Sequence, residues 1–150
     1  MEINSKIIDK FCGLLHFLNL SKKEFEMVAD EIEDCNLKTA LHGLSLESNQ
    51  CADELATQLK TLGIPFNSQA LELCIEEEPF IPQTEYIPGT GNELMNICSN
   101  SENTITKAYS EILSDYLPFN SLREMMMYQL NALKCAFMKI KTLNSARFAH

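Results

Sequence analysis

The spacing of the apolar residues constrains this chain more than any other feature, because they recur every three or four positions in four separate stretches. That spacing places them on one face of an α-helix, where they can be buried together. Only five glycines and five prolines interrupt the 150 residues, too few for a turn-rich β-sandwich or barrel. The pattern predicts an all-α fold, with helices over 3–33, 37–62, 91–117 and 121–143.

The lengths of the connections predict how these helices are arranged. The first and last links are short and favour antiparallel neighbours, whereas the stretch 64–90 can return along the whole bundle. Helices of about 26 residues span roughly 40 Å, and a connection of this length covers that distance at ~3.3 Å per residue. We therefore expect one domain over 1–150, a ferritin-like four-helix bundle of two antiparallel hairpins joined by a crossover.

The crossover combines four of the five prolines with apolar residues and with three consecutive acids, Glu76, Glu77 and Glu78. A long structureless loop is uncommon in a compact domain, and the apolar residues over 71–87 favour burial. We expect these residues to pack along the bundle or against a second copy, while the three glutamates stay in solvent.

Particular residues carry a resemblance to a known family. The segment from Phe25 to Lys38, with Glu47 to Gln50, Glu54-Leu55 and Leu62-Gly63, resembles the N-terminal hairpin of an uncharacterised bacterial family of ferritin-like four-helix bundles. The second half is similar to that family at Glu102, Tyr109, Leu117-Pro118 and Gln129, although the family's tryptophan-bearing helix is missing. The resemblance implies a bundle, and it implies no particular chemistry because the family is a domain of unknown function.

The charge of the chain bears on its partners. Twelve lysines and arginines stand against 21 acids, which gives a net charge of −9 and a pI of about 4.8. Without a basic run or stripe to neutralise phosphates, we expect no nucleic-acid partner. The most apolar early run, 11–20, is far shorter than the roughly 20 residues that cross a bilayer, so we expect no membrane span.

The cysteines indicate in which cellular compartment, oxidising or reducing, we expect the protein. Six of them lie far apart, and the chain opens without a basic region followed by an apolar signal stretch. We interpret them as reduced thiols of a cytoplasmic protein.

A ferritin-like bundle raises the question of a di-metal site, which needs Glu-x-x-His pairs on two of the helices. The sequence contains no Glu-x-x-His, and the nearest match is Glu47-Ser-Asn-Gln50, where an amide replaces the imidazole. The remaining weak candidates for metal ligands are Glu24 and Glu102. We therefore expect no metal and no cofactor.

Polar residues interrupt the inward stripes at Ser21, Ser48, Ser101 and Gln129. Buried polar groups cost roughly 1–3 kcal/mol when unpaired, so this polar layer requires hydrogen bonds, water or a function. Three interpretations stay open: hydrogen bonds that fix the packing of the helices, the remnant of a metal cavity, or a pocket for a small molecule.

Two further groups of residues invite a functional interpretation. Cys12 and His16 lie one helical turn apart, which is more often packing than a catalytic dyad. Met125, Met126 and Met127 cover about 300° of a helix, so that Met126 faces the core while a neighbour can lie on a second apolar face, such as a dimer interface.

These observations predict a non-catalytic ferritin-like bundle that acts through self-association, leaving a homodimer open, or through binding another protein. The alternatives are a carboxylate-bridged iron or manganese protein with a degenerate site, and a small-molecule-binding bundle. We expect no catalytic residues.

Overall fold

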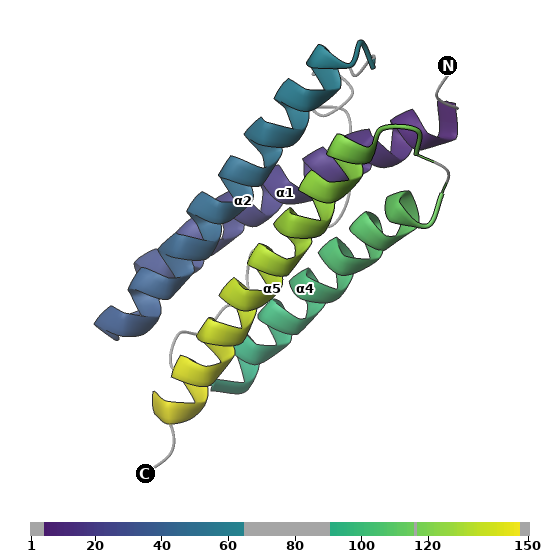
Figure 1. Ribbon diagram of the computed structural model, residues 1–150. Helices are drawn as coiled ribbons and strands as arrows, with labels where there is room; N and C mark the ends of the chain where they lie inside the picture. The colour runs from purple at the N-terminus through teal and green to yellow at the C-terminus, as the bar shows by residue number, and fades with distance from the viewer. Residues whose placement is uncertain (1–4, 65–90, 116, 148–150) are drawn as a thin grey trace.

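The computed structural model describes residues 5–115 and 117–147, apart from the segment 65–90. Four helices make up most of these ranges: α1 (Ser5–Glu31), α2 (Cys35–Thr61), α4 (Gly91–Leu113) and α5 (Asn120–Arg147) (Figure 1). The described part contains no strand, which confirms the predicted all-α class and the four helices. The crossover lies almost wholly outside the described residues, and so do the packing and exposure expected for it.

Contacts between side chains give the relative directions of the helices. The Oγ atoms of Ser21 and Ser48 lie 3.2 Å apart midway along α1 and α2, and these two helices run antiparallel after a short turn. Lys10, near the start of α1, pairs with Asp115, just beyond the end of α4, at 2.6 Å. Since α1 is antiparallel to both α2 and α4, those two helices run in the same direction (Figure 1).

Each helix packs against two neighbours. Helix α1 contacts α2 and α4, and α5 contacts the same two helices, whereas the diagonal pairs make no close backbone contact within the described ranges. Helix α5 runs antiparallel to α2, since Gln129 reaches Cys51 while the earlier Ser121 reaches the later Gln58. The four helices therefore enclose a single central core.

Local signals in the sequence account for both ends of α2. Asp34 is the N-cap, and its carboxylate accepts a hydrogen bond of 2.9 Å from the backbone N–H of Leu37. At the other end Gly63 adopts a left-handed φ of 72°, and the N–H of Ile64 donates to the carbonyl of Leu59 at 2.9 Å. This Schellman arrangement explains why the helix stops at the glycine that the sequence indicated.

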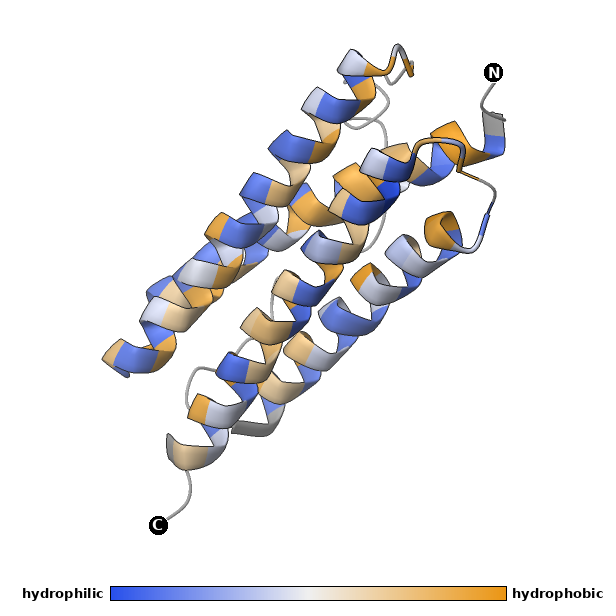
Figure 2. Cartoon of the chain, viewed as in Figure 1, coloured by the Kyte–Doolittle hydropathy of each residue, from blue (hydrophilic) through white to orange (hydrophobic). Residues whose placement is uncertain are grey.

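The core consists of the inward stripes of all four helices. Figure 2 shows hydrophobic and hydrophilic residues alternating along each helix, as expected for helices with one buried face. Phe25 of α1 and Phe137 of α5 meet edge to face at the centre, with ring centroids 5.9 Å apart. The largest fully buried side chains are Tyr109, Phe11, Phe25, Phe137, Leu14, Leu15, Leu18, Leu37, Leu41, Leu44, Leu55 and Leu59.

Two predicted helix ends differ from the structure by four residues, whereas the other ends lie within two residues of the prediction. Helix α4 ends at Leu113 instead of 117, because the buried Leu117 lies in the turn to α5 and not on a helical face. Helix α5 continues to Arg147, past the predicted end at 143, and Asn144 is 3 % exposed within this extra turn. Leu117 is buried without being helical, whereas Asn144 is a polar residue buried inside a helix, and the spacing of apolar residues indicates neither case.

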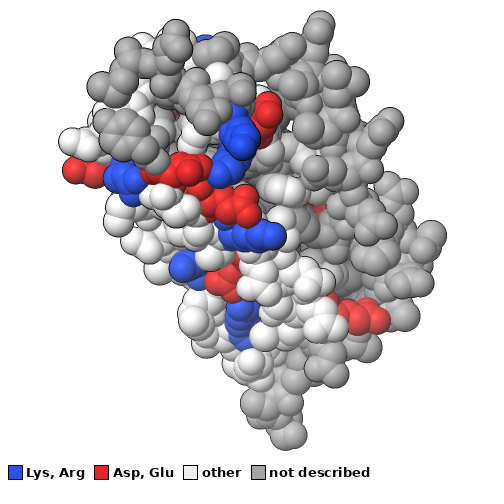
Figure 3. All heavy atoms as spheres, turned by 90° about the vertical axis from the view of Figure 1, so that its right-hand side faces the viewer, with Lys and Arg blue, Asp and Glu red and all other residues white. Residues whose placement is uncertain are grey.

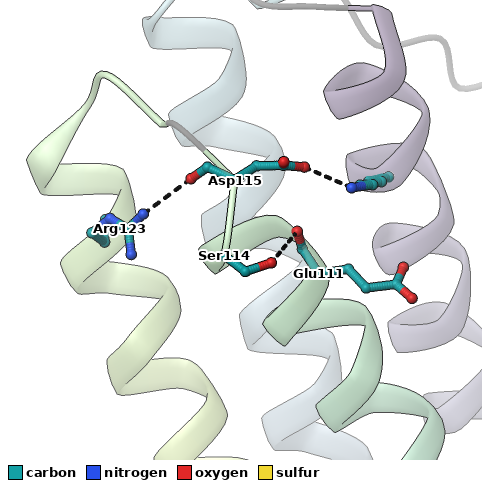
Figure 4. A network of polar contacts seen from close by, with 5 residues as sticks. Glu111, Ser114, Asp115 and Arg123 are labelled. Atoms are coloured by element: carbon teal, nitrogen blue, oxygen red, sulfur yellow. Dashed lines mark hydrogen bonds and ion pairs between the residues drawn. The ribbon is translucent and has the colours of Figure 1, made fainter.

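Charged side chains lie next to charges of the opposite sign on the face shown in Figure 3. One such group joins the start of α1 to the turn between α4 and α5 (Figure 4). Asp115 accepts from Lys10 through its carboxylate, and its backbone carbonyl accepts from Nη2 of Arg123 at 3.2 Å. Ser114 donates to the carbonyl of Glu111 in the same turn, at 3.2 Å. At this end of the bundle, polar contacts therefore link α1, the C-terminal end of α4 and α5.

Candidate functional site

A layer of buried polar side chains crosses the bundle, and three of the predicted polar positions, Ser21, Ser48 and Gln129, are hydrogen-bonded within it. The fourth, Ser101 on α4, is buried, and its Oγ has no hydrogen-bond partner among the described residues. Ser21, Ser48, Ser101 and Gln129 are each no more than 1 % exposed. Between α1 and α2, the hydroxyls of Ser21 and Ser48 bond to each other, and Ser45 donates to the backbone carbonyl of Lys22 at 2.8 Å. Small side chains there let the two helices approach closely while keeping their hydroxyls paired.

A second part of this layer links α2, α4 and α5 through Gln129. The hydroxyl of Tyr109 donates to Oε1 of Gln129 at 2.9 Å. Nε2 of Gln129 donates to the backbone carbonyl of Cys51 at 3.2 Å, and it lies 3.4 Å from the carboxylate of Glu54. The amide therefore uses both its oxygen and its nitrogen, and the chain of contacts leads from a buried phenol to an exposed carboxylate.

The thiol of Cys51, whose backbone carbonyl belongs to this network, is protonated at neutral pH. Burial, together with the nearby carboxylates of Glu47 and Glu54, raises the pKa of Cys51 to about 12, although a hydrogen bond with Tyr109 partly opposes this. Burial likewise raises the pKa of the Tyr109 phenol, and Cys51 adds to that shift. A thiol protonated at neutral pH is a poor nucleophile and a poor metal ligand, which favours a structural role.

Toward the C-terminal end of α5, an ion pair between Lys141 and Glu102 links α5 to α4. Lys141 donates to Oε1 of Glu102, with side-chain exposures of 25 % and 22 %. A lysine on a helix leans toward the helix N-terminus, which is how Lys141 reaches the glutamate from a later turn. Burial raises the pKa of the nearby Cys98 thiol to about 12; the charge of Lys141 lowers this pKa by a smaller amount, and that of Glu102 raises it slightly.

The four weak candidates for metal ligands have different environments. Glu24 is buried, Glu47 is half-buried, Gln50 is exposed and Glu102 is paired with Lys141. Among the described residues, no three His, Cys, Asp or Glu side chains come close enough together to hold a metal ion. The ammonium group of Lys141, which pairs with the carboxylate of Glu102, also competes with any metal cation for that carboxylate.

The remaining candidates also have defined places. Cys12 is half-buried and His16 is 6 % exposed, with its ring 5.7 Å from that of Phe17. Met126 is fully buried, as predicted, Met125 packs on the edge of the core, and Met127 is 51 % exposed. In the described ranges Cys35, Cys51, Cys98 and Cys135 are free thiols, and Cys74 lies outside those ranges.

No family model, curated protein or solved structure matches this chain. None of the four described helices combines the length and apolar character needed to cross a bilayer.

The sequence analysis did not identify Lys141 or the hydrogen bond from Tyr109 to Gln129. A signal for the second was present, because a tyrosine on an inward stripe needs a partner for its hydroxyl, and Gln129 interrupts the facing stripe.

Proposed function

We propose that this chain is a non-catalytic helical bundle of ferritin-like topology that acts by association, first of all with a second copy of itself. The observation that carries the proposal is the exposure of large apolar side chains on α5: Met127 at 51 %, Tyr128 at 74 % and Met138 at 63 %. Apolar side chains gathered on one helix favour a protein interface over solvent. The shared direction of α2 and α4 supports the ferritin-like arrangement.

The buried layer supports the non-catalytic part of the proposal. Ser21, Ser48 and Gln129 form hydrogen bonds with neighbouring helices, and the thiols of Cys51 and Cys98 have raised pKa values. Such a network stabilises one packing of the helices and offers no activated nucleophile.

The mass of the full chain in solution tests the proposal. Size-exclusion chromatography with light scattering, run across a concentration series, is expected to show a mass rising from 17.0 kDa toward twice that value. A mass that stays at 17.0 kDa up to ~100 μM, where even a weak micromolar dimer is populated, would contradict self-association.

The alternative of a carboxylate-bridged metal protein makes a different prediction, because it requires one or two irons or manganese ions held by each chain. Elemental analysis after incubation with excess ferrous iron and gel filtration separates the two. We expect no stoichiometric metal. The carboxylate of Glu102 is already paired with the ammonium of Lys141, and Gln50 is exposed on the surface of α2.

A further inference from the structure

One stretch of α1 is covered on every side. From Lys10 to Lys22, about three and a half helical turns, no residue is exposed. Within their described residues, α2, α4 and α5 instead have an exposed residue at least every four positions, as expected for helices with one face in water. Helix α1 packs against only two helices, α2 and α4. Something other than the four helices therefore covers its remaining face.

His16 shows this cover most clearly. It precedes Phe25 by nine positions, roughly two and a half turns, so the two side chains leave α1 on opposite faces. Phe25 meets Phe137 in the central core, yet His16 is only 6 % exposed. Cys12 and Leu20 lie one turn before and one turn after His16, and both are half-buried. We call Cys12, His16 and Leu20 the outer face of α1, and this face is packed although no described helix lies against it.

Two routes are open to the chain between α2 and α4. The contact of Ser21 with Ser48 and the pair of Lys10 with Asp115 fix the levels of the helices. They place the C-terminal end of α2 near the start of α1, and the N-terminal end of α4 near the end of α1 (Figure 1). Helices α1 and α5 each lie between α2 and α4, so the segment 65–90 reaches α4 most directly along one or the other. The two routes differ in what each helix leaves exposed.

The other ranges that the structure does not describe are 1–4, 116 and 148–150. Their lengths exclude them as the cover. The residues before Ser5 reach at most ~13 Å, less than the roughly 16 Å from Ser5 to His16. The residues after Arg147 reach ~10 Å, whereas Arg147 lies roughly 20 Å beyond the covered stretch along the bundle. Only the segment 65–90, which can extend ~85 Å, is long enough to follow α1.

We propose that the segment 65–90 docks along the outer face of α1 and so passes on the side of the bundle opposite α5. The surface consists of Cys12, His16 and Leu20, and its partner is the apolar part of the segment. The inference does not depend on self-association, because it concerns how the two helical hairpins of one chain are joined.

The segment contributes seven large apolar residues: Leu71, Leu73, Ile75, Phe80, Ile81, Tyr86 and Ile87. They match α1, whose most apolar run, 11–20, needs cover on more than its core face. Charge alone favours the other route, since the segment has five acids and no base whereas α5 has five bases and one acid. Burial decides between the two, because an apolar segment along α5 would cover Met127, Tyr128 and Met138, and all three are exposed.

The native cysteines test the route without any substitution. Cys74 belongs to the segment, Cys12 to the outer face of α1, and Cys135 is exposed on α5. A short bifunctional maleimide joins two thiols by adding each S–H across one of its double bonds, so no oxidant is needed. We expect at least tenfold more of the Cys12–Cys74 link than of the Cys74–Cys135 link in the monomer fraction, by peptide mass mapping. A ratio of one or less, absence of both links included, would overturn the inference.

Thiol protection gives a second readout. The segment variant carries Leu73→Ser, Ile75→Ser, Phe80→Ser and Ile81→Ser. Because these changes remove apolar contacts on α1, we expect iodoacetamide to modify Cys12 at least tenfold faster than in the wild type. The exposed thiols of Cys35 and Cys135 should change less than twofold. An unchanged rate at Cys12, or a larger change at Cys135, would overturn the inference.

The matched control variant makes the same type of change at exposed apolar positions: Met27→Ser, Met127→Ser, Tyr128→Ser and Met138→Ser. It should leave the rate at Cys12 within twofold of the wild type, and equal acceleration in the two variants would contradict the proposed contact. The buried thiols of Cys51 and Cys98 report whether each variant stays folded. If they also react fast in the segment variant, that variant is unfolded, and the ratio of cross-links in the wild type decides.

Discussion

The hydroxyl of Tyr109 in α4 donates a hydrogen bond to Oε1 of Gln129 in α5 across 2.9 Å, and both side chains are buried. The same glutamine donates to the backbone of Cys51 in α2, so one amide connects three of the four described helices. A contact of this kind fixes the level at which the helices pack, because sliding any one of them by a turn would leave buried polar groups unpaired.

Removing the Tyr109 hydroxyl should therefore destabilise the fold. Tyr109→Phe leaves the oxygen of Gln129 buried without its donor, and we expect a loss of about 1–3 kcal/mol in unfolding free energy. Denaturant titration followed by circular dichroism measures it. Tyr128→Phe, at a phenol that is 74 % exposed, is the control and should stay within about 0.5 kcal/mol of wild type. Equal effects of the two changes would show that the buried hydroxyl contributes nothing.

Stability should fall with rising pH in the alkaline range. The thiols of Cys51 and Cys98 have pKa values of about 12 in the fold against an ordinary 9.0, so between these values the unfolded chain loses protons that the folded chain keeps. Folding stability from these groups is complete below pH 9 and declines as pH rises toward 12.

The comparison that isolates the thiols uses alanine variants. Cys51→Ala with Cys98→Ala should flatten the pH dependence of the unfolding free energy above pH 9, while Cys35→Ser, at an exposed thiol, should leave it unchanged. A slope that is the same in all three proteins would contradict the assignment.

The ion pair between Glu102 and Lys141 should contribute more than an exposed pair. A double-mutant cycle with Glu102→Gln and Lys141→Met is expected to give a coupling of about 1 kcal/mol. The control cycle is Lys107 with Glu111 on α4, which lie 4.0 Å apart with side-chain exposures of 78 % and 49 % and should show almost no coupling. A larger coupling in the control would reverse this ranking.

Gly43, inside α2, and Gly63, just beyond its C-terminal end, should respond oppositely to the same substitution. Gly63 has a φ of 72°, which strains any side chain, so Gly63→Ala should cost about 1 kcal/mol. Gly43 lies inside the helix with nothing within 4 Å of an added Cβ, and Gly43→Ala should stabilise by about 0.5–1 kcal/mol. Thermal melts of both variants measure the difference, and shifts of the same sign would contradict it.

The helices could be predicted from the sequence because their apolar stripes and their end signals agree. Leu41, Leu44 and Leu55 fall on one face, and Gly63 marks the stop, so local and tertiary preferences coincide. The ends of α4 and α5 differ from the prediction because the pattern of apolar residues assigns a buried leucine to a helix and places an asparagine outside one. Leu117 is buried in a turn, and Asn144 is buried in a helix.

The positions of the buried polar residues could be predicted from the sequence, but the hydrogen bonds that they form could not. Interruptions of the stripes located Ser21, Ser48 and Gln129, since each polar residue stands where an apolar one is expected. Their partners depend on how far neighbouring helices are displaced along one another, which no local pattern contains. Lys141 shows this plainly, because it reaches Glu102 only through the length and tilt of its side chain.

Sedimentation equilibrium of wild type, Tyr109→Phe and Met127→Lys under identical conditions tests the central claim, that the chain acts by association through α5. We expect the wild type and Tyr109→Phe to approach twice the monomer mass of 17.0 kDa with similar Kd, because Tyr109 is buried whereas Met127, Tyr128 and Met138 are exposed. Met127→Lys should shift toward the monomer by at least tenfold in Kd. A wild type that sediments as 17.0 kDa at every concentration would contradict the claim.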